Sequence, residues 1–72
     1  MLVTDVERRF GPVRQVTLSE IEQRQYVEFA RQPAFLTFRL DYTGIFVPGA
    51  HETTRFEPGA KIFSIAVSMP NR

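Results

Sequence analysis

Apolar and polar residues alternate at the two ends of the chain, whereas a stretch between them is compatible with a helical period. Residues 2–10 alternate imperfectly, which is typical of a strand with one wetter face. Gly11-Pro12 interrupts the pattern, and residues 13–16 resume it as a second short apolar segment. The first sixteen residues therefore predict a β-hairpin.

The next segment carries the signals of a helix start. Thr17 and Glu20 have the spacing of a capping box, and Ile21 supplies half of the hydrophobic contact that often accompanies one. Pro33 disfavours helical geometry at the residue before it, so we expect a helix over about residues 18–31. Its apolar side chains fall on one broad side and its Glu and Arg side chains collect opposite, as in a helix that packs on a sheet.

Four further strands are predicted after this helix, over residues 34–42, 45–47, 51–56 and 61–69. Alternation is clearest in residues 34–42, where every second side chain is a large apolar group. The turns that separate the strands are rich in proline and glycine. This spacing of short strands is typical of a β-meander, an open sheet or a small barrel.

Two Pro-Gly pairs, Pro48-Gly49 and Pro58-Gly59, each follow a phenylalanine at the same offset. Proline suits the second position of a type II turn and glycine tolerates the positive φ that its third position requires. The whole pattern predicts an α+β fold that is predominantly β. In this single domain of residues 1–72, one helix packs on a curled antiparallel sheet or small barrel of five to six short strands.

Composition favours a folded domain that gains stability from a partner. The chain is 43% hydrophobic with seven Phe, so it has enough apolar content to fold. A core of this length supplies only ~3–5 kcal/mol of net stability, and small domains commonly add a disulfide, a metal or another chain. With no Cys and one His, a disulfide and a zinc site of thiolates and imidazoles are excluded. We expect no cofactor and no metal, and association with another chain.

The sequence does not favour an enzyme. His51-Glu52 is the one acid–base pair that includes an imidazole, and it follows a Pro-Gly turn where exposure is expected. Ser64 and Ser68 lack the glycine-rich elbow of a nucleophile, and no phosphate-binding or dinucleotide-binding glycine pattern occurs. We therefore predict no catalytic residues, with an enzyme that uses His51 as the weakest alternative.

A non-enzymatic interaction or assembly subunit is the leading prediction, by analogy with small accessory proteins of phage-like particles and with inhibitors that dock on larger machines. The strand at 61–69 has an apolar set, Phe63, Ile65, Val67 and Met69, and contains no proline. We expect this strand to be central in the sheet or paired across an interface, because a bare apolar edge recruits other strands. The candidate residues for a protein partner or a homo-oligomer are Phe35, Arg39, Phe46, Phe56, Phe63 and Ile65.

The alternative prediction is a small nucleic-acid-binding β-domain. Single-strand binders combine stacking aromatics with a positively charged groove, and this chain has eight Arg against one Lys. The candidate contacts are Arg8, Arg9, Arg14 and Arg39, which should then share one surface. A net charge of +1 leaves little unbalanced positive charge, which favours the protein partner.

The location of the protein is predicted from two missing patterns. The N-terminus lacks the basic and apolar regions of a signal peptide, and no apolar run approaches the ~20 residues that cross a bilayer. We expect no membrane association, and a place in the cytoplasm or in a particle assembled there.

Overall fold

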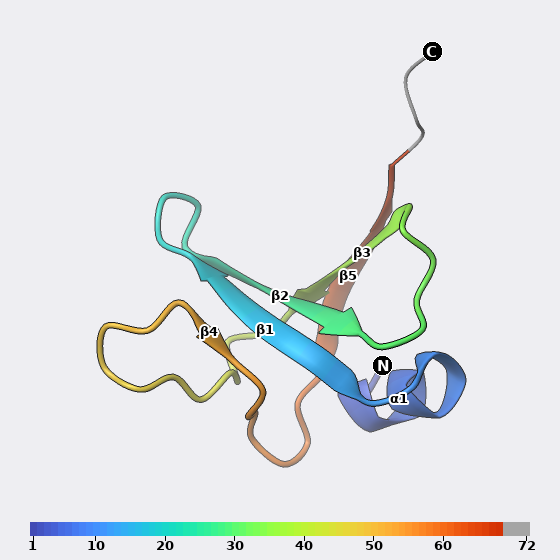
Figure 1. The fold of residues 1–72 in the computed structure, drawn as a ribbon, viewed down its shortest axis with the longest axis horizontal. Coiled ribbons are helices and arrows are strands. Elements are labelled where there is room, and N and C mark those ends of the chain that lie inside the picture. The colour runs from blue at the N-terminus through green and yellow to red at the C-terminus, as the bar shows by residue number, and fades with distance from the viewer. Residues whose placement is uncertain (69–72) are drawn as a thin grey trace.

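The fold is built on one antiparallel sheet. The computed structural model describes residues 1–68 and contains one antiparallel sheet of five strands, in the order β4-β1-β2-β3-β5, with one helix (Figure 1). The elements are α1 (Val3–Phe10), β1 (Val13–Ser19), β2 (Arg24–Phe29), β3 (Leu36–Leu40), β4 (Glu52–Thr53) and β5 (Ile62–Val67). The sheet is strongly twisted and open, so the predicted α+β, mainly β fold is confirmed in its sheet form and not as a barrel.

The predicted helix at 18–31 is wrong, because this segment forms the hairpin of β1 and β2. Gln25, Val27 and Phe29 are all buried while the residues between them are more exposed, which is the period of a strand. The free energy gained by burying these alternate side chains in the core exceeds the small free energy that the local helix-start signal contributes.

The capping signal forms the hairpin turn instead. The Ser19 hydroxyl accepts a hydrogen bond from the Glu22 N–H at 3.4 Å, and Gln23 adopts a positive φ of 54°. Ser, Asp and Thr side chains bond the backbone in turns as readily as at helix starts, so the same residues suit both. Ile21, expected to pack beside the helix start, is 99% exposed at the tip of this turn.

The helix lies at the N-terminus, where a strand over residues 2–10 was expected. Val3, Val6 and Phe10 follow the spacing of a helix face, and they pack into the core while the residues between them face outward. Gly11 ends α1 with a φ of 85°, and its N–H donates to the Glu7 carbonyl at 2.8 Å. The period-two alternation in residues 2–10 was too imperfect to distinguish a strand from a helix.

One face of the sheet, here called the inner face, carries the core. Its centre is Phe38, whose ring lies 5.2 Å from that of Phe29 and 5.8 Å from that of Phe10. α1 packs on this face, together with Phe46 and Phe56 from the long connection between β3 and β5. The opposite face, here called the outer face, carries the alternate side chains of the same strands, and many of these are polar or small.

Both Pro-Gly turns form as predicted. Gly49 and Gly59 have φ values of 84° and 82°, and in each turn the residue after glycine donates its N–H to the carbonyl three residues earlier. The first turn leads into β4 and the second into β5. Among the described residues, no helix is long and apolar enough to cross a membrane.

Candidate interaction edge

β5 lies at one edge of the sheet and pairs with β3 on its other side. Its first part is also covered on the outside, because the N-terminal segment runs beside it. The Ile62 N–H donates to the Met1 carbonyl at 2.7 Å, and the Val3 N–H donates to the Ala60 carbonyl at 2.9 Å. This cover ends at Ile62, so the rest of β5 has no strand outside it among residues 1–68.

The register with β3 shows which backbone groups of β5 point outward. Ser68 is opposite Phe35 and donates its N–H to the Phe35 carbonyl at 2.8 Å, so this pair is hydrogen-bonded. Hydrogen-bonded pairs recur at every second residue of an antiparallel ladder, and therefore Ala66 also points its N–H and C=O toward β3. Ile65 and Val67 point theirs away from the sheet.

The side chains along this edge are apolar and accessible. Phe63, Ile65 and Val67 are 61%, 47% and 58% exposed. β5 contains no charged residue and no proline. An edge strand with these properties offers unpaired backbone groups and apolar area together, which is the combination that binds an added strand.

A bulge in β5 divides its apolar side chains between the two faces, which sequence alternation did not predict. Ile62 and Phe63 together lie opposite Leu40, and the ladder resumes with Ser64. Ile65 and Val67 therefore lie on the inner face with Phe38, whereas the Phe63 ring lies 4.4 Å from the Arg39 guanidinium on the outer face. Met69, the fourth member of the expected apolar set, lies outside the described residues.

An apolar pocket of about 370 Å³ opens beside this edge on the inner face. α1 and the N-terminus form one wall, and β3 with Ile65 forms the other. Its lining residues are Met1, Asp5, Val6, Arg9, Phe10, Leu36, Phe38 and Ile65. Apolar side chains make up most of this lining, and the two charged residues both come from α1. A strand added to β5 would therefore carry its inner-face side chains next to a concave apolar surface.

The six residues predicted to contact a protein partner do not form one surface. Ile65, Phe63 and Arg39 lie on or beside β5, and Phe35, half exposed, immediately precedes β3. Phe46 and Phe56 are partly buried and pack against the core, away from β5. From the sequence, Val67 was named in the apolar set of this strand but not among the candidate contacts, and the N-terminal segment beside β5 was not predicted. Both placements depend on which strand forms the edge.

The four arginines proposed as nucleic-acid contacts lie on two sides of the sheet, so the expectation that they share one surface is wrong. Arg8 and Arg9 belong to α1, and Arg8 contacts Asp5 at 3.2 Å. Arg14 on β1 lies 3.7 Å from Glu28. Arg39 on β3 stacks on the Phe63 ring. Two of the four cations are thus next to a carboxylate.

His51 contacts Glu20 rather than its neighbour Glu52. Its Nε2 lies 2.6 Å from the Glu20 carboxylate, and both side chains are largely exposed. The contact joins the β1–β2 turn to the start of β4. General catalysis needs an oriented base in a site that excludes water, and this arrangement is open to solvent.

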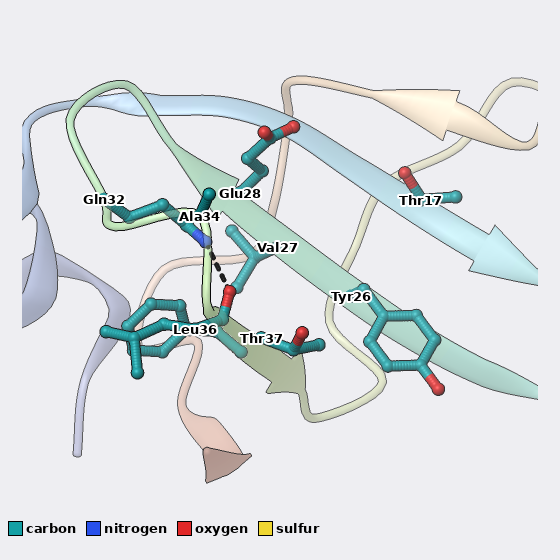
Figure 2. Close-up of a pocket in the computed structure, with 9 residues that line it drawn as sticks. Thr17, Tyr26, Val27, Glu28, Gln32, Ala34, Leu36 and Thr37 are labelled. Carbon is teal, nitrogen blue, oxygen red and sulfur yellow. Dashed lines mark hydrogen bonds between the residues drawn. The ribbon is translucent and has the colours of Figure 1, made fainter. Parts of the chain in front are cut away.

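A second pocket, of about 250 Å³, lies over β1, β2 and β3 and is shown in Figure 2. Thr17, Tyr26, Glu28 and Thr37 contribute to its lining. Gln32 closes one end, where its amide donates to the Leu36 carbonyl at 2.8 Å and accepts from the Phe29 N–H. This glutamine joins the ends of β2 and β3, which is a structural role.

One arginine near this surface has a shifted pKa. Hydrogen bonding and charge from Tyr26, followed by the charge of Glu22, raise the pKa of Arg24 above its ordinary value. The guanidinium therefore stays charged and does not exchange protons in the physiological range.

Comparisons of the chain with protein-family models, with curated proteins and with solved structures found no match.

Proposed function

We propose that this protein is a non-enzymatic interaction or assembly subunit that binds another polypeptide as an added strand along β5. The observation that carries the proposal is the exposed half of β5. The backbone groups of Ile65 and Val67 point away from β3 at the sheet edge, and their apolar side chains are about half exposed on the inner face. Backbone hydrogen bonds would hold the added strand, and the adjacent pocket would select its side chains.

The size of the domain supports the same proposal. A core of this length leaves a net stability of only ~3–5 kcal/mol, and burying an apolar edge in a complex adds to it. A partner strand that covers the exposed part of β5 would therefore supply stability that the small core lacks.

The test uses a substitution that removes an outward donor and keeps the β3 ladder. Val67→Pro deletes the outward N–H, and proline is tolerated on an edge strand where its nitrogen faces solvent. A library of random twelve-residue peptides is selected against the immobilised protein, and the affinities of the enriched peptides are measured by fluorescence anisotropy. We expect alternating apolar peptides, with affinity reduced about tenfold or more by Val67→Pro, because each lost backbone bond contributes ~1 kcal/mol and the ring obstructs the edge.

Glu52→Pro is the matched control, because its N–H points outward at the opposite edge. The Leu18 N–H donates to the His51 carbonyl at 2.8 Å, so in β4 the following residue faces away from β1. This variant should bind the peptides like the unmodified protein. Failure to enrich any peptide, or equal binding by Val67→Pro, would contradict the proposal.

Nucleic acid remains the alternative prediction, and the same assay includes it. The observation in its favour is the stacked pair of Arg39 and Phe63 on the outer face. A labelled oligothymidine replaces the peptide in this arm. Tight, salt-dependent binding that Val67→Pro leaves unchanged, without any enriched peptide, would favour the alternative.

A further inference from the structure

We infer that the strand bound by β5 is the β5 strand of a second copy of this chain, paired antiparallel about a two-fold axis at Ala66. This inference rests on the proposed function, because it names the partner of the same edge. It follows from three properties of β5: the direction of its backbone groups, the residues on its two faces, and the length of edge left free by the N-terminal segment.

The direction of the backbone groups restricts the register. Ile65 and Val67 are the residues of the free edge whose N–H and C=O point outward, so they must be opposite outward residues of the added strand. With the axis at Ala66, Ile65 is opposite the partner's Val67 and Val67 is opposite the partner's Ile65. Each of these two pairs can exchange two backbone hydrogen bonds, and Ala66 lies opposite the partner's Ala66 in a pair without them.

The side chains are self-complementary in this register. Ile65 and the partner's Val67 meet on the inner face, where Ile65 lines the apolar pocket. On the outer face Ser64, Ala66 and Ser68 alternate with these residues, and such small side chains make no steric clash across the pair. Residues 62–68 contain no charge, so the pairing opposes no like charges within this segment.

The N-terminal segment determines the extent of the pairing. Because Met1 already accepts from the Ile62 N–H, an added strand cannot continue past Phe63 without displacing it. The contact is therefore short, and an interface that buries less than about 1,200 Å² belongs to the weak, transient class. A covalent trap suits such a complex better than chromatography of a dilute sample.

The chain contains no Cys, so a single introduced cysteine reports one position. Across an antiparallel pair without hydrogen bonds the Cα atoms are about 4.5 Å apart, which is within the range that a disulfide spans. Under mild oxidation of the full chain, Ala66→Cys should become mostly disulfide-linked dimer on a non-reducing gel. Adding Val67→Pro to this variant should abolish the dimer.

Two controls separate the register from random collision. In the proposed register a cysteine at Ser64 lies about 13 Å from its own copy, so Ser64→Cys alone should not crosslink. Glu52→Cys on the other edge should also remain monomeric. By contrast, a mixture of Ser64→Cys and Ser68→Cys should give the mixed dimer, because these two positions are opposite each other in this register.

The outcomes distinguish this inference from the proposed function. If Ala66→Cys crosslinks no faster than Ser64→Cys or Glu52→Cys, the second copy is not the occupant, even where peptides still bind at β5. Crosslinking of Ser64→Cys with Ala66→Cys in place of the predicted pairs would move the axis to Ile65 and overturn the stated register. Failure of both the peptide and the cysteine experiments would remove the proposed function as well.

Discussion

The two edges of this sheet are built differently. β4 has two residues, and its outward-facing residue is the charged Glu52. The chain leaves β4 at once, since the Thr53 hydroxyl accepts from the Arg55 N–H at 3.1 Å and closes a turn. β5 has six residues, and its free half is apolar and uncharged.

The difference shows how each edge would respond to another strand. Pairing at β4 would desolvate a carboxylate and gain few hydrogen bonds, so this edge resists added strands. At β5 the bulge and the N-terminal segment protect the beginning of the strand. Beyond Phe63 neither feature is present among the described residues, and this is the edge where we propose that a strand is added.

The largest effect is expected where a substitution breaks β5 itself. Ala66 directs its N–H toward Thr37, so Ala66→Pro removes a ladder bond and places the ring against β3. We expect a loss of about 2 kcal/mol or more in the free energy of unfolding, measured by urea denaturation. That loss is a large part of the ~3–5 kcal/mol available at this length.

Val67→Pro is the matched comparison, one residue along the same strand. Its N–H points outward, so its effect on the free energy of unfolding should stay below about 0.5 kcal/mol. Equal destabilisation by the two prolines would mean that the assigned direction of Val67 is wrong. The distinction between a free half and a paired half of β5 would then fail.

A smaller effect is expected at the turns that lead into the two edges. Gly49 and Gly59 have positive φ, and a Cβ at either position would meet no atom within 4 Å. The cost of Gly49→Ala or Gly59→Ala is therefore backbone strain alone, about 1 kcal/mol in each case. Thermal melts should show a lower midpoint for both variants, by roughly 4–8 °C.

The double glycine variant sharpens the comparison between the edges. No backbone hydrogen bond joins the two turns, so the losses should add to within about 0.5 kcal/mol. Gly59 precedes Ala60, whose carbonyl holds the N-terminal segment beside β5. A loss at Gly49→Ala with no loss at Gly59→Ala would show that the second turn relaxes freely and does not fix the cover over β5.

How far the sequence predicted this fold depended on the range of the interactions. Gly49 and Gly59 follow from local backbone sterics, and their turns formed as predicted. The helix was misplaced because Thr17 and Glu20 give a local signal that a hairpin can also use. The segment that does form α1 has apolar side chains at Val3, Val6 and Phe10, a helical spacing obscured by the alternating residues between them.

The candidate site was predicted in part for the same reason. The apolar character of Phe63 and Ile65 is visible in the sequence, and both are exposed on β5. Their separation onto two faces depends on a bulge opposite Leu40, and strand order depends on pairing between residues far apart in the chain. Neither is encoded in a local pattern, so the outward direction of the Val67 backbone and the cover by Met1 could not be predicted.

The smallest effect is expected at the β4 edge, where His51 contacts Glu20 in solvent. An exposed pair of this kind contributes about 0–1 kcal/mol, because water and salt screen it. His51→Ala should therefore change the free energy of unfolding by no more than about 0.5 kcal/mol in urea. Asp5→Asn, which breaks the exposed contact with Arg8, is a matched control and should have a similarly small effect.

Association provides the decisive readout for this variant, because the contact could also act by shielding β4. If β4 resists added strands through its length and Glu52, then His51→Ala should leave it inert, and Glu52→Cys in that background should still not crosslink. New crosslinking at Glu52→Cys would show that the His51–Glu20 contact is what blocks this edge. The two edges would then differ by one exposed side-chain contact rather than by how their strands are built.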